Sequence, residues 1–194
     1  IDDHFFIIRS FDGGKNWDEI SKKNYQIADS GEACFASSGT NIRKLNKQEA
    51  VFISGGVKSN LFISNKKISL PIIQGKTSTG GNSIAVKNDK TMIIMGGDFT
   101  KKDDTTENCA LTYNGGKTFI TPETGPHGYR SCVEYINKKS WISCGLNGVD
   151  ISTDEGKNWN WISKSSFNVC RKAKKGNAIF FAGANGKMGK LETN

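Results

Sequence analysis

The sequence has few of the residues that build metal sites, cofactor sites or membrane spans. Its 194 residues include only 3 prolines and 2 histidines, and no apolar run approaches the roughly 20 residues that a membrane-spanning helix needs. It contains no Cys-x-x-Cys pair, and so few histidines cannot complete a zinc site. Its Gly-Gly pairs end apolar strands and do not open helices, so they are not phosphate cradles. The composition predicts no metal, no cofactor and no transmembrane segment.

The net charge of +8 raises the question of a nucleic-acid or acidic partner. The lysines are scattered through predicted turns, and the densest basic cluster is Arg171, Lys172, Lys174 and Lys175, around one predicted hairpin. Nothing resembles a recognition helix or an RNA-binding aromatic strand. A solvated basic face is therefore favoured, and no nucleic-acid partner is expected.

The chain has five cysteines, so at least one thiol is free or pairs with another chain. Cys34, Cys132 and Cys170 fall in the same predicted strand of three repeats, which favours small buried apolar side chains over ligands. Cys132 and Cys144 face each other if the intervening turn centres on Lys138. A disulfide between these two is the less favoured alternative.

A polar turn motif recurs along the chain and sets its organisation. It reads Ser152 to Trp159, Ser10 to Trp17 and, more loosely, Thr112 to Phe119. In each copy an Asp or Asn side chain can accept hydrogen bonds from backbone N–H groups, a glycine supplies positive φ, and an aromatic ring covers the turn. These stretches resemble the Asp-box (BNR repeat) of sialidase-like β-propellers. The positions assigned to turn structure are Ser10, Asp12, Gly14, Trp17, Asn114, Gly116, Phe119, Ser152, Asp154, Gly156 and Trp159.

The spacing of the repeats predicts an all-β propeller of four-stranded antiparallel blades. The turn positions Asp12, Lys66 (a degenerate copy), Asn114 and Asp154 are 54, 48 and 40 residues apart, close to the roughly 40–50 residues of a blade. Apolar strands ending in glycine recur in step, and their lack of polar alternation suits strands covered on both faces. We expect one domain, 1–194, with blades at 1–27 (partial), 28–76, 77–124, 125–164 and 165–194 (partial).

The phase of the strands indicates a part of a larger ring. The chain holds five predicted third strands of a blade but only four first and second strands, so its ends cannot close a four-bladed circle. It begins at Ile1 and not at Met, so any targeting peptide lies out of sight. We expect a six- or seven-bladed ring, in which missing N-terminal blades or another chain cover the open blade face.

Four further stretches carry a closer resemblance: Gly31–Ser38, Pro71–Lys76, Gly96–Asp98 and Gly125–Val133. They are similar to secreted Asp-box propellers common in Bacteroidetes, often labelled oxidoreductases, which are related to the Ycf48-like photosystem II assembly factors. The resemblance implies a secreted, periplasmic or cell-surface location behind a signal peptide. It implies no established reaction and no catalytic residues. The second repeat departs from the pattern, because Ser64 to Lys67 stands where the turn motif belongs.

Candidate site residues come from the loops expected at one mouth of the propeller channel. Residues before first strands and after second strands should converge there, and Glu32, Asp98, Tyr129 and Arg130 are the preferred ligand-binding set. The further members of this mouth are Thr79, Asn82, Lys58, Asn147 and Asn185. An arginine among carboxylates suits an anionic ligand. The structural alternative is that Arg130 pairs with Glu32 or Glu134.

Two functions remain open. The favoured one is a non-catalytic binding or assembly module that presents a rigid face to a protein or glycan partner, since no nucleophile–base pair or cofactor loop is visible. The alternative is a sialidase-like glycoside hydrolase with part of its site on missing blades. Its arginine cluster is not evident, because arginine occurs only at positions 9, 43, 130 and 171. An oxidoreductase is the least favoured reading. For the acidic pair Asp103 and Asp104, a solvated loop is favoured and a calcium site is the less favoured alternative.

Overall fold

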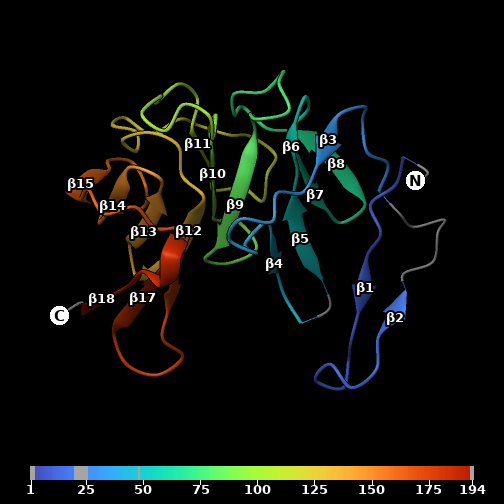
Figure 1. Ribbon diagram of the computed structural model, residues 1–194. Helices are drawn as coiled ribbons and strands as arrows, with labels where there is room; N and C mark the ends of the chain where they lie inside the picture. The colour runs from blue at the N-terminus through green and yellow to red at the C-terminus, as the bar shows by residue number, and fades with distance from the viewer. Residues whose placement is uncertain (1–2, 20–25, 48, 193–194) are drawn as a thin grey trace.

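The computed structural model covers residues 1–194 and describes 3–19, 26–47, 49–192. Within this part, antiparallel sheets follow one another along the chain and stand side by side as an arch (Figure 1). β1 and β2 lie at one end of the arch and β18 lies at the other. No helix in the described ranges is long and apolar enough to cross a membrane.

The strands of the N-terminal half form four sheets. They are β1 (Ile8–Arg9) with β2 (Asp18–Glu19); β3 (Glu32–Ala33) with β6 (Gly55–Gly56); β4 (Ile42–Lys44), β5 (Ala50–Ile53), β7 (Asn60–Ile63) and β8 (Lys66–Ser69); and β9 (Gly81–Val86), β10 (Met92–Gly96) and β11 (Cys109–Thr112). An isolated bridge from Leu111 to Ile120 adds a fourth, outer segment to the last of these sheets.

The C-terminal half forms two further sheets. They are β12 (Cys132–Asn137), β13 (Ser140–Gly145), β14 (Gly148–Ser152) and β15 (Asn160–Ser163), followed by β16 (Val169–Lys172), β17 (Ala178–Ala182) and β18 (Met188–Glu192), with a 3-10 turn η2 (Ala184–Gly186) between the last two. Sequential antiparallel strands in radially repeated sheets are the arrangement of a β-propeller. The expected all-β propeller fold is confirmed.

The hydrophobic core lies between neighbouring sheets. One cluster joins Ile53 and Leu61 to Met92 on β10. A second joins Ile93 to Trp141, and a third joins the sheet from β12 to β15 with the one from β16 to β18. Because each middle sheet is covered on both faces, its strands are apolar without alternation, as the sequence predicted.

The three predicted polar turns share one set of hydrogen bonds. Gly156 N donates to Ser152 Oγ at 3.0 Å, and Asn158 N donates to Asp154 Oδ1 at 3.0 Å. The equivalent backbone donors reach Ser10 at 2.8 Å and Asp12 at 3.0 Å in the first copy, and Thr112 at 2.9 Å and Asn114 at 3.0 Å in the third. These side chains replace backbone partners inside the turn.

The second repeat closes differently. Ser64 and Asn65 both have positive φ, +46° and +61°, and form a two-residue hairpin turn between β7 and β8. Such a turn matches the twist of the flanking strands and needs no polar box. The blade therefore forms although the motif is lost at Lys66.

The first strand of that repeat is short. Only Glu32–Ala33 pairs, with β6, and the inner edge of the larger sheet is β4. The Phe35 ring lies against Gly55, where any Cβ would collide with it. The chain then crosses to the next sheet, where Ile84 N donates to Thr40 O at 3.0 Å.

Cys132 and Cys144 are direct register partners on β12 and β13, as predicted from the turn at Lys138. All five cysteines are free thiols, and four of them are buried. The less favoured disulfide is therefore absent, and the thiols pack as small apolar side chains.

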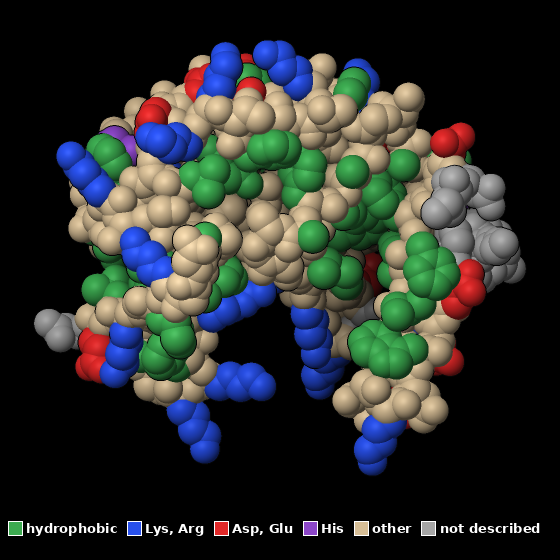
Figure 2. Space-filling view, in the orientation of Figure 1, with side chains coloured by type: hydrophobic (Ala, Val, Ile, Leu, Met, Phe, Trp, Pro, Cys, Tyr) green, Lys and Arg blue, Asp and Glu red, His purple; other side chains and the backbone are tan. Residues whose placement is uncertain are grey.

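The end of the arch that carries β1 and β2 exposes several large hydrophobic residues. Phe6, Ile8, Phe11 and Trp17 are all exposed there, and Figure 2 shows hydrophobic side chains over this end. Lys and Arg side chains project into the opening on the concave side of the arch (Figure 2).

Candidate functional site

A cavity of about 390 Å³ opens at one end of the propeller axis. Its walls come from the starts of inner strands, including β9 and the segments before β12 and β16, and from the loops after β10 and β13. The lining residues are Phe35, Ala36, Ser37, Asn82, Phe99, Tyr129, Ser131, Leu146 and Asn168. Residues far apart in sequence thus converge at one mouth, and the volume lies within the usual range for ligand sites.

Aromatic rings form the wall of this axial cavity. Phe99 lies edge-on to Phe35 at 5.8 Å between centroids and to Tyr129 at 6.4 Å. Phe99 and Leu146 are 41% and 38% exposed, so their apolar surfaces face solvent. Such side chains gain most when a partner covers them.

Neutral polar groups form its floor. Asn82 Nδ2 donates to Tyr129 Oη at 2.6 Å, and Ser37 Oγ donates to Asn82 Oδ1 at 3.0 Å. Ser131 Oγ donates to the carbonyl of Asn168 at 2.7 Å. Burial raises the pKa of Tyr129 to about 12, so its hydroxyl stays neutral. The floor offers fixed hydrogen-bonding groups without charge.

Of the four preferred site residues, only Tyr129 lines this cavity; of the further predicted members, Asn82 does. Asp98 is buried in its own loop, where its carboxylate accepts hydrogen bonds from Thr100 Oγ1 at 2.6 Å and Thr100 N at 3.0 Å. The hydroxyl bond from Thr100 holds the pKa of Asp98 below its usual value. This carboxylate shapes the loop that carries Phe99.

Arg130 is fully buried beneath the mouth. Its guanidinium donates through Nε to Asp150 Oδ2 at 2.6 Å, again through Nη2 to the same oxygen, and through Nη1 to Asn147 Oδ1 at 2.5 Å. His127 Nδ1 lies 2.6 Å from the other oxygen of Asp150. The predicted partners Glu32 and Glu134 were wrong, because β14 brings Asp150 next to Arg130.

Glu32 belongs to a separate buried network. Its Oε1 accepts hydrogen bonds from Ser54 Oγ and, at 2.8 Å, from Asn60 Nδ2. Its Oε2 lies 2.9 Å from Lys67 Nζ. Glu32 therefore ties β3 to the neighbouring sheet and has no oxygen left for a ligand.

The opposite end of the axis is charged. Arg43 Nη2 and Arg171 Nη1 reach one carboxylate oxygen of Glu134 at 2.6 and 3.3 Å. A cavity of about 360 Å³ lies there, lined partly by Arg43, Lys44 and Glu134. Between the two mouths, Thr40 Oγ1 lies 2.5 Å from Ser83 Oγ and donates to Cys132 Sγ at 3.8 Å. Side chains therefore fill the axis between the two mouths.

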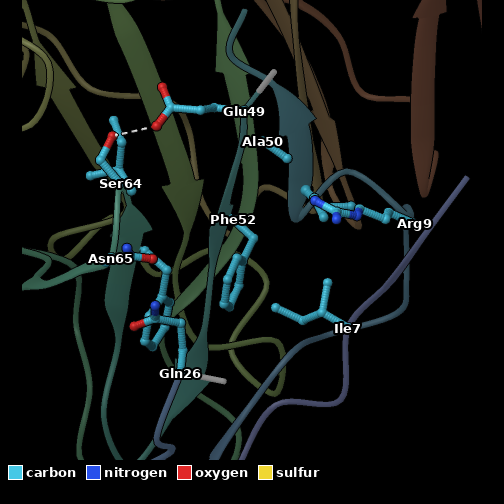
Figure 3. Close-up of a pocket in the computed structure, with 11 residues that line it drawn as sticks. Ile7, Arg9, Gln26, Glu49, Ala50, Phe52, Ser64 and Asn65 are labelled. Atoms are coloured by element: carbon cyan, nitrogen blue, oxygen red, sulfur yellow. Dashed lines mark hydrogen bonds between the residues drawn. The ribbon is translucent and has the colours of Figure 1, made fainter. Parts of the chain in front are cut away.

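A third cavity, of about 320 Å³, separates the N-terminal segment from the sheet of β4, β5, β7 and β8 (Figure 3). Ile7 and Phe52 point toward each other across it, and Ser64 Oγ bonds to Glu49 Oε1 at 3.0 Å. At one side, Phe5 packs edge-on against Phe52 at 5.5 Å. The gap marks incomplete contact between neighbouring sheets.

No group of three or more His, Cys, Asp or Glu side chains that could hold a metal ion occurs in the described ranges. In the acidic loop, Asp103 accepts a hydrogen bond from Asn147 Nδ2 at 2.9 Å, and Asp104 accepts one from Thr106 N at 2.9 Å. Asp103 thus ties this loop to the loop after β13, and Asp104 holds the turn of its own loop.

Sequence reasoning missed Phe35, Phe99, Leu146, Ser131 and Asn168. Leu146 directly follows the terminal glycine of a predicted second strand, and Phe99 lies two residues after another, so their positions were available. The charged neighbours were preferred because charge suggests a ligand, whereas the structure uses those charges internally.

No protein-family model matches the sequence, and no curated protein matches it. The fold is similar to solved structures. A computationally designed protein, Ika4, aligns with a TM-score of 0.52 and 13% identity over 80% of this chain and 92% of that one. YCF48 bound to D1 peptide aligns with a TM-score of 0.53 and 13% identity over 79% of this chain and 49% of that one. Both likenesses support a multi-blade β-propeller and, at this identity, establish the fold alone.

Proposed function

We propose that this chain is a non-catalytic binding propeller that holds a segment of a partner protein in the axial cavity. The observation that carries the proposal is the pairing of an exposed apolar wall, Phe99 and Leu146, with a neutral floor locked by the bond between Asn82 and Tyr129. A preorganised floor costs little entropy on binding. The exposed wall supplies apolar area that a partner buries.

A protein partner suits this cavity better than a glycan or an acidic ligand. The rings in the wall pack edge-on against one another, and no charged side chain lines the cavity to bind an acidic ligand. Its volume accepts an apolar side chain with a short stretch of backbone. One structural neighbour is described as bound to a peptide, which supports the same mode of use.

The hydrolase alternative receives no support from the geometry. Arg130, the arginine nearest the mouth, is saturated by Asp150 and Asn147, and Glu32 is saturated by Ser54, Asn60 and Lys67. Neither can bind a substrate carboxylate or transfer a proton without dismantling the fold. We therefore put forward no second function.

We further propose that the three polar turns are Asp-boxes of a Ycf48-like protein outside the cytoplasm, in the secreted, periplasmic or cell-surface location expected from the sequence. Additional blades or a second chain would cover the apolar end at Phe6 and Trp17. Fractionation of cells producing the full-length protein tests the location. Recovery in the cytoplasm would contradict it.

The binding proposal is tested by selecting peptides on the purified protein and measuring their affinities by calorimetry. We expect Phe99→Ala and Leu146→Ala each to weaken a selected peptide about tenfold or more, as for central apolar anchors. Ile162→Ala is the matched control, because Ile162 is 46% exposed on β15 and does not line the cavity. If selected peptides ignore both cavity variants, the assigned site is wrong. Turnover of a fluorogenic sialoside by the purified protein would support hydrolysis in place of binding.

A further inference from the structure

Three buried thiols gather where the last two sheets meet. Cys132 lies on β12, Cys144 faces it on β13, and Cys170 lies on β16 of the next sheet. All three side chains are 0% exposed and belong to one apolar cluster with Ile142 and Phe181. The binding proposal does not use them.

Cys132 occupies the central position of this thiol cluster. Its sulfur accepts a hydrogen bond from Cys170 Sγ at 3.7 Å and another from Thr40 Oγ1 at 3.8 Å. Burial opposes the thiolate of Cys132, but hydrogen bonds from Cys144, Cys170 and Thr40 outweigh it and hold its pKa below the usual value. The bond to Cys132 raises the pKa of Cys170. The hydrogen bond from Cys170 therefore holds the two sulfurs in contact across the sheet interface.

We propose that Cys132 and Cys170 form a peroxide-driven disulfide that links the last two sheets. The two sulfurs already face each other across the sheet interface, and a disulfide requires them to close from 3.7 Å to about 2.05 Å. Closing this gap requires the two side chains to rotate toward each other. Cys144 stands beside Cys132 on the paired strand, so a bond to Cys144 would leave the interface unlinked.

The chemistry balances with hydrogen peroxide as the oxidant. Cys132 gives up its proton, and its thiolate attacks one peroxide oxygen. The O–O bond breaks, the departing hydroxide takes up a proton to become water, and Cys132 becomes a sulfenic acid. The Cys170 sulfur then attacks the Cys132 sulfur and displaces the sulfenic oxygen as water, as Cys170 loses its proton. Two thiols are oxidised by two electrons, and one peroxide is reduced to two waters.

The thiol cluster lies close in sequence to residues that line the axial cavity. Ser131, which lines the axial cavity, directly precedes Cys132, and Asn168, on the same cavity wall, lies two residues before Cys170. The cluster lies at the interface between the sheet of β12 to β15 and the sheet of β16 to β18. Transient opening there admits peroxide without unfolding the other sheets.

The experiment treats the purified chain with hydrogen peroxide, quenches it with an alkylating reagent and maps its peptides by mass spectrometry. We expect three alkylated cysteines where the untreated chain has five, and a single linked peptide pair that holds Cys132 and Cys170. The melting temperature should rise. Dithiothreitol should reverse the thiol loss, the link and the rise in melting temperature. Retention of five thiols, a Cys132–Cys144 link, or sulfinic acid at Cys132 without a link would each overturn the proposal.

Variants separate the assigned roles. Cys170→Ala should abolish the link, while Cys144→Ala and the control Cys109→Ala, which lies in a different core cluster, should keep it. Thr40→Val removes the hydroxyl donor and should slow the link severalfold without preventing it. If a cysteine variant fails to fold, the peptide map of the unaltered chain still decides the linkage, and Thr40→Val still tests activation.

Discussion

The two tryptophans that close equivalent turns provide the sharpest test of what stabilises this fold. Trp159 Nε1 donates to Gly156 O at 2.9 Å, and Trp17 Nε1 donates to Gly14 O at 3.1 Å. The local bonding is therefore the same. Their burial is not, because Trp159 is 1% exposed between two sheets and Trp17 is 58% exposed.

The difference in burial sets the expected magnitudes. A fully buried aromatic side chain removes about 150–250 Å² from water, which at about 25 cal/mol per Å² is worth about 4–6 kcal/mol. Measured Trp→Ala losses in cores are about 3–5 kcal/mol, and we expect this range for Trp159→Ala. Trp17 keeps less than half of its surface buried, so Trp17→Ala should cost about 1–2 kcal/mol.

Urea unfolding followed by circular dichroism measures both losses without relying on tryptophan fluorescence. The comparison requires that the free energy of unfolding fall with urea concentration at the same slope in both variants, which would show that both expose the same surface area on unfolding. Equal losses would mean that the turn itself, and not burial between sheets, carries the stability. A larger loss for Trp17→Ala would refute the reasoning outright.

Three further changes test the turns and the buried ion pair. Gly156→Ala should lose about 2–4 kcal/mol in urea unfolding, because Gly156 has φ +89° and a Cβ there collides with Ile93. Hydrogen bonds from the backbone and side chain of Asn16, then from Ser10, lower the pKa of Asp12 from 3.8 to about 2. The stability from this carboxylate is therefore present above pH 3.8 and is lost as the pH falls through about 2. An NMR titration of Asp12 with a midpoint near its ordinary value would contradict this. Arg130→Met should cost about 3–5 kcal/mol in the same unfolding assay, since it leaves Asp150 buried without its cation, and an Arg130→Met/Asp150→Leu double variant should recover part of the loss.

The fold was predictable because its signals are local and repeated. The turn from Ser152 to Trp159 specifies its own hydrogen bonds. The apolar, glycine-ended sequences of strands such as β10 and β13 indicate burial on both faces. The register of Cys132 opposite Cys144 followed from the turn at Lys138. Each inference needed only residues close in sequence.

The candidate site was predictable in position but not in composition. The mouth residues before first strands do converge, and Tyr129 and Asn82 meet there. The partners of Arg130 and Glu32 could not be predicted, since Asp150 and Lys67 reach them only after separate strands have paired. Buried charges require partners, and the sequence offered several for each.

The sequence by itself determined the strand order, the turn chemistry and the sheet-on-sheet core, because hydrogen bonds and apolar periodicity over a few residues specify them. Tertiary structure alone decided which polar groups bond to one another inside the fold and which remain available to a partner. It placed Asp150 beneath Arg130, left Phe99 and Leu146 open at the mouth, and brought Cys170 to Cys132 across two sheets. Those outcomes depend on how whole sheets meet, which no short stretch of the chain encodes.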